Sequence, residues 1–289
     1  MKMDRKLAIS LQIKKYALGP FLGMYQSLFR GQGIEYDEIR KYVPGDDPKA
    51  MVWAKLAQMG EAYVKTFLEE RDLTVIVALD ISGSMFWARP EKGKLAVEAA
   101  SVLLFSAGVS RDRVGLALFS DTLNEFIPPR RGMTHMGRLV ETLGKITPTA
   151  RKTSLKTSFQ AIGARRGPKR AAVFLISDFM CRDEQWELSL EVLSKNNDVI
   201  AVKVQDDWEK NPTPLGWVYT SDAEKEGCSL VHFDQDTAEE WERRVGEEKQ
   251  RLKKTTTMHD IGFVEIDEGY DPLGVLRAYF ERRCRILKR

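Results

Sequence analysis

The sequence predicts an α/β protein with a mostly parallel central sheet and helices on both of its faces. Four segments consist almost entirely of apolar residues, which is typical of strands that are buried on both sides: 73–80, 114–119, 171–177 and 199–204. Segments with helical periodicity alternate with these runs, as in parallel sheets that are built from crossover units. With 289 residues, 43% of them hydrophobic, the chain is also long enough to enclose a large core.

Helices are expected between and after these strands. Residues 92–109 are apolar nearly all round, which predicts a helix that is heavily buried. Asp183 is a candidate cap for a later helix, whose apolar side chains recur at helical spacing on one face. The segments predicted to be helical are 92–109, 134–146, 153–165 and the one that carries Trp186, Leu190 and Leu193.

The two ends of the chain are predicted to add smaller elements around this unit. Leucines recur at helical spacing within residues 1–30, and residues 62–69 alternate as a strand does. Residues 217–221 and 229–234 are expected to be short strands around a polar turn, and 261–267 an edge strand of the main sheet. We therefore divide the chain into an N-terminal segment (1–70), a central domain (71–205) and a C-terminal extension (206–289) that completes the sheet and its helices.

Two helices of the C-terminal extension carry recognisable start signals. Thr237 and Glu240 have the spacing of a capping box, which predicts that a charged helix opens there and extends to about residue 254. Asp271 followed by Pro272 combines a capping side chain with a proline that suits a first helical turn. The last helix is therefore expected to begin at this pair.

Composition excludes several classes of protein. The chain has 45 Lys and Arg against 42 Asp and Glu, and a net charge of +3 is too small for a dedicated nucleic-acid binder. No stretch approaches 18 consecutive apolar residues, so no membrane span is expected. The first residues contain no apolar signal-peptide core, and Cys181, Cys228 and Cys284 offer no disulfide framework or metal clip. These features predict a cytoplasmic protein.

Carboxyl and hydroxyl side chains gather directly after the first buried strand. Asp80, Ser82 and Ser84 form a D-x-S-x-S sequence in a turn that Gly83 relieves sterically, and Asp178 follows the third buried strand. Open parallel sheets bind ligands beyond the carboxyl ends of their strands, so we expect these oxygens to converge. Such oxygens suit Mg²⁺, Mn²⁺ or Ca²⁺ rather than zinc. The pattern predicts a divalent-cation site that can accept a carboxylate from a partner protein without breaking a bond.

Two other interpretations of this turn remain open. Asp, Ser and Gly also build ordinary strand-to-helix turns, in which hydroxyls cap backbone N–H groups. A haloacid-dehalogenase-like phosphatase also places a nucleophilic Asp at this point and uses Mg²⁺, but its motif is D-x-D, and Ser82 cannot act as the general acid. The chain has no Walker-type phosphate loop and no local Cys–His signature. We therefore expect no enzymatic activity.

Residues 73–205 resemble a von Willebrand factor A domain, a Rossmann-like α/β fold that carries a metal-ion-dependent adhesion site. That site combines D-x-S-x-S with a Thr from a later loop and an Asp after a later central strand. Asp80, Ser82 and Ser84 match its first part and Asp178 matches its last. For the Thr, the resemblance implies Thr153, with Thr149 as the alternative.

The segment before this domain narrows the resemblance to one bacterial family. Residues 31–47 contain the pattern GxGxEYxxIRxYxxGDD, and Trp53 follows it. This is similar to the signature of domain-of-unknown-function family fifty-eight, whose members carry it immediately before a von Willebrand factor A domain. Two roles are open for residues 35–53: a polar buttress whose aromatic side chains, Trp53 included, pack on the sheet, or a docking surface that includes Arg40, Asp46 and Asp47.

The resemblance also implies a function. Family members are encoded beside MoxR-type AAA+ ATPases, and the pairs are thought to act as chaperone-like machines that mature client proteins. We therefore expect an interaction module that binds one Mg²⁺, or Mn²⁺ or Ca²⁺, and engages a carboxylate of the ATPase or its client through this ion. The expected metal-site residues are Asp80, Ser82, Ser84, Thr153 and Asp178.

Overall fold

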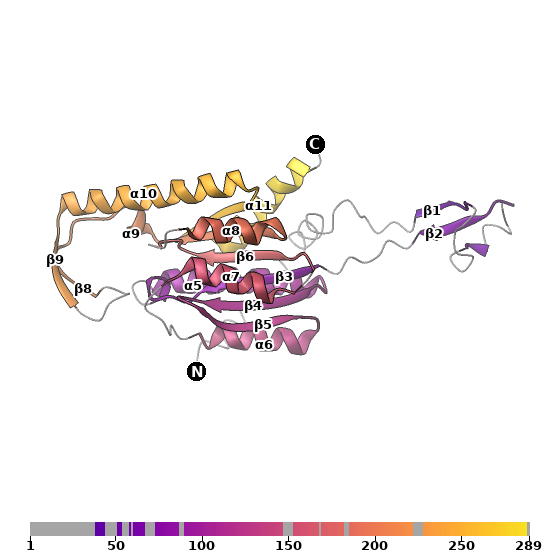
Figure 1. The fold of residues 1–289 in the computed structure, drawn as a ribbon, viewed down its shortest axis with the longest axis horizontal. Helices are drawn as coiled ribbons and strands as arrows, with labels where there is room; N and C mark the ends of the chain where they lie inside the picture. Colours follow the sequence, from indigo (N-terminus) through magenta and orange to yellow (C-terminus); the bar gives the residue numbers. More distant parts are fainter. Residues whose placement is uncertain are drawn as a thin grey trace.

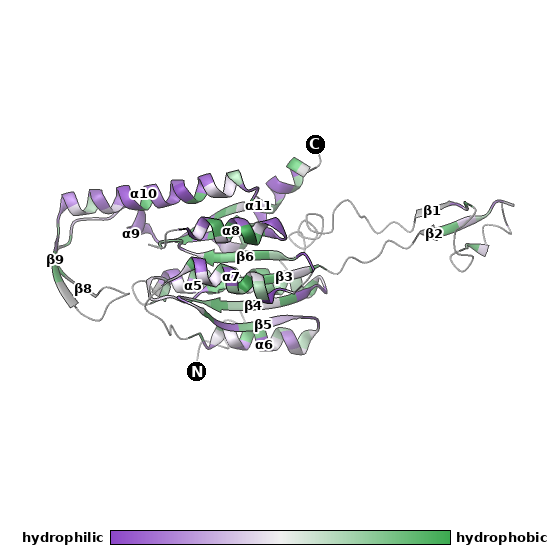
Figure 2. Ribbon diagram, viewed as in Figure 1, coloured by the Kyte–Doolittle hydropathy of each residue, from purple (hydrophilic) through white to green (hydrophobic). Residues whose placement is uncertain are grey.

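A six-stranded sheet with helices on both faces forms the body of the protein (Figure 1). Its strands consist mainly of hydrophobic residues, whereas the long helix α10 (Gln235–Met258) is mostly hydrophilic (Figure 2). The predicted α/β fold is therefore confirmed. The computed structural model describes residues 38–43, 51–53, 58, 60–66, 73–86, 90–146, 153–167, 169–181, 185–221 and 228–287.

The central sheet is parallel except at one edge. The strand order is β10-β7-β6-β3-β4-β5, and only the β4–β5 pair is antiparallel. From β3 the chain first continues to β4 on one side and later places β6 on the other side, so the strand order reverses between β3 and β6. Ligands of open α/β sheets bind at such a reversal. The strands are β3 (Thr74–Asp80), β4 (Arg113–Phe119), β5 (Leu123–Arg130), β6 (Ala172–Ser177), β7 (Asp198–Gln205) and β10 (Gly262–Asp267).

Helices bury both faces of this sheet, because alternate strand residues point to opposite sides. Val75, Val77 and Leu79 of β3 belong to a core with α5, α6 and α11, whereas Ile76 and Ala78 face a second core with α7 and α8. Among the described residues, no helix is both long enough and apolar enough to cross a membrane. The other helices are α4 (Gly83–Phe86), α5 (Pro90–Val109), α6 (Met133–Gly144), α7 (Leu155–Arg165), α8 (Trp186–Lys195), α9 (Asp207–Lys210) and α11 (Pro272–Leu287).

The antiparallel edge strand β5 was not predicted from the sequence. It contains Pro128 and Pro129, which lie opposite the single residue Gly115 of β4 in a bulge of the ladder. A Cβ atom at Gly115 would lie 2.9 Å from the carbonyl oxygen of Ile127 and 3.0 Å from Cγ of Pro129. Glycine is therefore required here, because the two strands approach too closely for a side chain.

The start predicted for α10 was wrong. Asp234 caps this helix, since its Oδ1 accepts the backbone N–H of Thr237 at 3.0 Å, and the helix continues to Met258. Thr237 is thus the third residue of the helix and not its cap. Asp234 is the cap because its backbone is extended and its carboxylate accepts one of the N–H groups that are free at the start of the helix. Asp271 does cap α11 as expected: its side chain accepts N–H groups of Leu273 and Gly274.

Smaller sheets lie outside the central one. Strands β1 (Glu38–Lys41) and β2 (Tyr63–Thr66) form one antiparallel pair, and β8 (Gly216–Ser221) and β9 (Cys228–Phe233) form the hairpin predicted for the C-terminal extension. Trp53 is 63% exposed, so the expectation that it packs on the main sheet was wrong. The helical prediction for residues 1–30, the cap Asp183, and the docking residues Asp46 and Asp47 lie outside the described residues.

Candidate cation site

Two aspartates meet at the reversal of strand order. Asp80 is the last residue of β3, and Asp178 follows directly on β6, its parallel neighbour. Their exposed fractions are 0% and 1%. The apolar strands that carry them are buried on both faces, so the polar ends of these neighbouring strands are buried as well. The structure therefore brings together the two carboxylates that the sequence singled out.

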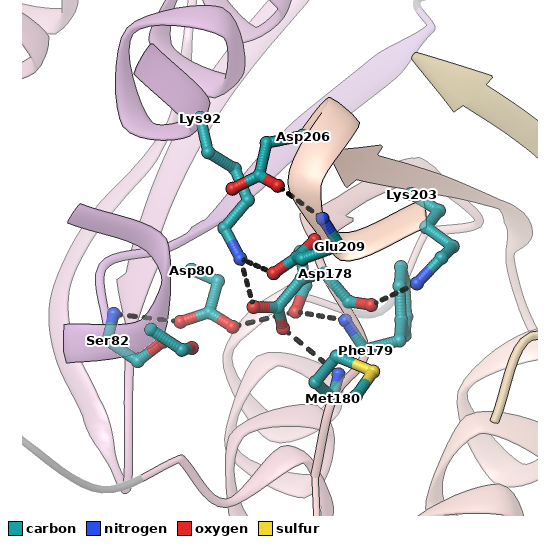
Figure 3. A network of polar contacts seen from close by, with 11 residues as sticks. Asp80, Ser82, Lys92, Asp178, Phe179, Met180, Lys203, Asp206 and Glu209 are labelled. Atoms are coloured by element: carbon teal, nitrogen blue, oxygen red, sulfur yellow. Dashed lines mark hydrogen bonds and ion pairs between the residues drawn. The ribbon is translucent and has the colours of Figure 1, made fainter. Parts of the chain in front are cut away.

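The turn after β3 places Ser82 beside Asp80 (Figure 3). The backbone N–H of Ser82 donates to Oδ1 of Asp80 at 2.9 Å, which closes the turn. The hydroxyl oxygens of Ser82 and Ser84 lie 3.1 Å apart, within hydrogen-bonding distance of each other. Ser82 is buried and Ser84 is half-buried, so Ser84 is the more accessible of the two residues.

Ser177 is a member of the site that the sequence did not reveal. Its hydroxyl donates to Oδ2 of Asp80 at 2.7 Å and accepts the backbone N–H of Phe179 at 3.0 Å. Because both oxygens of Asp80 are hydrogen-bonded, the carboxyl group has a fixed orientation. The one sequence signal for Ser177 was its place as the only hydroxyl residue of an otherwise apolar strand, directly before Asp178.

Asp178 is held by three separate contacts. Its Oδ1 accepts the backbone N–H of Met180 at 3.0 Å, and its Oδ2 accepts the ammonium of Lys92 at 2.9 Å. The ammonium of Lys203 donates to the main-chain oxygen of Asp178 at 2.7 Å. Asp178 is thus already paired with a cation that belongs to the protein itself.

Lys92 bridges Asp178 to Glu209 of the short helix α9 (Figure 3). Its ammonium lies 2.9 Å from Oδ2 of Asp178 and 2.6 Å from Oε1 of Glu209. The side chains are 1%, 1% and 11% exposed, so this is an interior ion-pair cluster. This cluster could not be predicted from the sequence, because Lys92 lies at the start of an apolar helix, where the side chain of a lysine is ordinarily exposed to solvent.

Burial and charge move the pKa values of these acids in opposite directions. Burial, together with the negative charge of Asp178, raises the pKa of Asp80 to about 7. Burial also favours a higher pKa for Asp178, but the charge and hydrogen bond of Lys92 outweigh it and hold that pKa below the ordinary value. Burial raises the pKa of Glu209 despite its contact with Lys92. The negative charge at Asp80 is therefore the one that the protein leaves least compensated.

Thr153 lies in the loop before α7, close to the segment that follows Asp178. Its main-chain oxygen accepts the thiol of Cys181 at 3.5 Å, and the next residue, Ser154, donates its N–H to the carbonyl of Ser120 at the end of β4. These contacts attach the loop to the same end of the sheet as Asp80. Thr149, the alternative hydroxyl ligand, lies outside the described residues.

The donors present fit a hard divalent cation. Among the described residues, no three His, Cys, Asp or Glu side chains form a metal-binding group, so a cation here depends on hydroxyls as well as carboxylates. The buried Asp80, whose carboxylate is destabilised by Asp178, together with Ser82 and Ser84, supplies such a mixed set. A positive ion beside Asp80 removes the electrostatic cost that raises its pKa.

Fold and site together define an α/β protein with a buried cluster of oxygen-bearing side chains at the switch point of a mostly parallel sheet. The family model described as "Protein of unknown function DUF58" matches residues 38–251. The match covers well over half of the chain and includes Asp80, Ser82, Ser84, Thr153 and Asp178. The chain belongs to this family.

Its curated relatives include uncharacterized proteins of two mycobacteria. Both the protein Mb1516 of Mycobacterium bovis and the protein Rv1480 of Mycobacterium tuberculosis are 28% identical over 230 residues. The alignments cover 76% of this chain and 72% of each relative. Both relatives are described as uncharacterized, so they suggest no activity for this chain.

Similar solved structures come from other bacteria and from an animal. An aerotolerance-related membrane protein from Bacteroides fragilis shares 15% identity over 73% of this chain and 99% of its own, with a TM-score of 0.48. The conserved hypothetical protein BatB from Bacteroides thetaiotaomicron shares 15% identity over 74% and 99% of the two chains, with a TM-score of 0.47. Proximal thread matrix protein 1 from the mussel byssus, with a zinc-occupied MIDAS motif, shares 18% identity over 46% and 38%, with a TM-score of 0.39.

Proposed function

We propose that this protein is a non-enzymatic interaction module that binds a divalent cation at a site of the von Willebrand factor A type. The observation that carries the proposal is the buried turn at the end of β3, where a fixed carboxylate, Asp80, lies with the adjoining hydroxyls of Ser82 and Ser84. Its position at the switch point, beside a second carboxylate, supports a ligand site.

In this proposal the residues have different tasks. Asp80 supplies the anionic ligand, and Ser82 and Ser84 supply neutral hydroxyl oxygens. Thr153 and Asp178 complete or orient the shell. Mg²⁺ is the proposed ion, with Mn²⁺ or Ca²⁺ as substitutes, because all donors are oxygens. The bound ion supplies a positive charge with open positions for a carboxylate of a partner protein.

The proposed partner is a MoxR-type AAA+ ATPase or its client in the cytoplasm. Membership of the family supports this choice through the pairing that the sequence resemblance implies. The phosphatase alternative is disfavoured, because Ser82 occupies the position of its general acid. A MoxR-type ATPase should bind the protein in Mg²⁺ and be released by EDTA.

The site is tested by substituting Asp80. Parent protein should melt at a higher temperature in Mg²⁺ than in EDTA, because an ion at 100 times its dissociation constant stabilises the folded state by about 2.7 kcal/mol. Asp80→Ala should stay folded in EDTA and lose the Mg²⁺-dependent rise. Differential scanning fluorimetry over a Mg²⁺ titration measures both.

Asp198→Ala provides the matched control. Asp198 pairs with Arg283 at 2.7 Å at the other end of the sheet, so its loss should lower the melting temperature equally in Mg²⁺ and EDTA. If Asp80→Ala and the parent respond alike to Mg²⁺, the proposed site is wrong. Turnover of a generic phosphoester by the parent, but not by Asp80→Ala, would contradict the non-enzymatic role.

A further inference from the structure

The negative charge of Asp178 is already balanced by the ammonium group of Lys92, without a bound metal ion. Its Oδ2 is taken by Lys92 at 2.9 Å, its Oδ1 by the N–H of Met180 at 3.0 Å, and its main-chain oxygen by Lys203 at 2.7 Å. Asp80 instead receives neutral donors, from the hydroxyl of Ser177 and from Ser82. The two neighbouring carboxylates therefore differ sharply in how much positive charge each already has.

Lys92 cannot easily leave this position. The side chain is 1% exposed, and its ammonium has a second anionic contact with Glu209 at 2.6 Å. Glu209 is itself fixed, because α9 opens with Asp206 accepting the N–H of Glu209 at 2.7 Å. Removing either partner of a buried ion pair is costly, since it leaves an uncompensated charge in the interior.

Helix α9 is also anchored on its other side. Trp208 packs against Phe233 of β9 and Trp241 of α10, with ring centroids 5.4 and 5.8 Å apart. Lys210 of the same helix forms an ion pair with Asp267 at the end of β10. A four-residue helix is not stable alone, so these contacts hold Glu209, and through it Lys92, at Asp178.

We propose that Lys92 is a specificity-determining residue, which keeps Asp178 from neutralising the bound cation and so reserves the ion's charge for a partner carboxylate. This inference rests on the cation site proposed above and concerns how that site selects its ligand. Because Asp178 is paired with Lys92, a divalent ion at the site is balanced by one carboxylate, that of Asp80. About one positive charge of the ion then remains uncompensated. An external carboxylate then completes the neutralisation.

The proposal gives Lys92→Met two effects of opposite sign. The variant releases Asp178 to the ion and removes a nearby positive charge, so Mg²⁺ affinity should rise by at least about tenfold. Because the ion is then neutralised by two carboxylates, the Mg²⁺-loaded variant should lose affinity for acetate, the carboxylate probe. A lysine that served only to stabilise the fold would produce neither change.

Isothermal titration calorimetry of the full chain measures both affinities, with Mg²⁺ alone and then acetate on Mg²⁺-loaded protein, and with chloride as the ionic-strength control. Lys92→Arg keeps the charge and should bind Mg²⁺ within about threefold of the parent, a small difference in free energy. Lys94→Met lies on the same helix with its side chain 68% exposed, so its affinities should match the parent.

If Lys92→Met does not fold, the double variant Lys92→Met/Glu209→Gln replaces it. Glutamine at 209 avoids leaving a buried carboxylate without its cation, and Asp178 is released in the same way. A folded variant whose Mg²⁺ affinity is unchanged or lower overturns the role of Lys92 while the cation site stands. A parent protein that binds no Mg²⁺ overturns the cation site, and this inference with it.

Discussion

Asp80 and Asp178 show how strongly the surroundings of a single residue decide its chemistry. Both are fully buried carboxyl groups on neighbouring strands, yet the pKa of one is raised and that of the other is lowered. The difference is Lys92, whose ammonium donates a hydrogen bond to Asp178 and not to Asp80. Ionisation of Asp80 is therefore electrostatically unfavourable, whereas ionisation of Asp178 is favoured by its contact with Lys92.

The raised pKa of Asp80 predicts that the stability of the protein depends on pH. In EDTA, folded Asp80 keeps its proton to about pH 7, whereas the unfolded chain releases it near pH 4. The contribution of Asp80 to stability is thus fully present below about pH 4 and is lost as the pH rises through 7, on the order of 4 kcal/mol in all.

The Asp80→Asn variant lacks this contribution, because an amide side chain does not ionise between pH 4 and 8. The unfolding free energy of Asp80→Asn minus that of the parent should therefore increase between pH 4 and 8, as measured by urea denaturation in EDTA. Taking this difference cancels the titration of groups that do not interact with Asp80. A difference that stays constant over this range would show that Asp80 is not buried as an acid of raised pKa.

Only part of the site could be predicted from the sequence. Asp80, Ser82 and Ser84 share one turn, so their spacing alone indicated that their oxygens converge. Lys92 and Glu209 are separated by 117 positions, and Lys92 and Asp178 by 86. No local pattern encodes such contacts, because they depend on how the strands are ordered in the finished sheet.

At the scale of elements, glycines show how differently α10 and β10 tolerate a side chain. A Cβ at Gly262, the first residue of β10, would lie 2.0 Å from Oη of Tyr279 and 3.0 Å from Cγ1 of Ile200. A Cβ at Gly246, within α10, would have no atom within 4 Å. The strand start is closely packed by α11 and β7, whereas this part of the helix is open on one side.

The two substitutions should therefore change stability in opposite directions. Gly262→Ala overpacks a rigid contact and should lower the free energy of unfolding by about 1 to 3 kcal/mol. Gly246→Ala should raise it by up to about 1 kcal/mol, since alanine favours the helix more than glycine does. Urea denaturation of each variant measures the sign; a stabilising Gly262→Ala would contradict the close packing of Tyr279.

The elements that the sequence predicted well are those whose signal is local. Each long apolar run became a central strand, because only burial on both faces suits such a run. Strand β5 was missed, since its two prolines and exposed polar residues suggest a loop, and pairing with β4 overrides that tendency. The start of α10 was misplaced because Asp234 and Thr237 both carry capping side chains.

At the scale of the whole molecule, one sheet separates two hydrophobic cores. Phe280 of α11 packs edge-on against Phe174 on one face, with ring centroids 6.2 Å apart. Trp186 of α8 is fully buried on the other face, next to Phe179 at 6.4 Å. Because both cores are built on the same strands, they should unfold in one cooperative transition.

Substitutions in the two cores should be additive. Phe280→Leu and Trp186→Leu should each lower the free energy of unfolding by about 1 to 3 kcal/mol, and the double variant should lose the sum within about 0.5 kcal/mol. Trp217→Leu, at a position that is 69% exposed, should change stability by less than about 0.5 kcal/mol. If circular dichroism and tryptophan fluorescence reported two separate unfolding transitions, the two cores would not unfold as one cooperative unit.

The bulge at the edge of the sheet also affects how molecules meet one another. Pro128 and Pro129 remove two successive N–H donors from β5, the strand that ends the sheet on that flank. An intermolecular ladder needs an uninterrupted row of donors to template the next chain. We therefore expect edge-to-edge aggregation through this flank to be disfavoured by the same irregularity that made the strand hard to predict from the sequence.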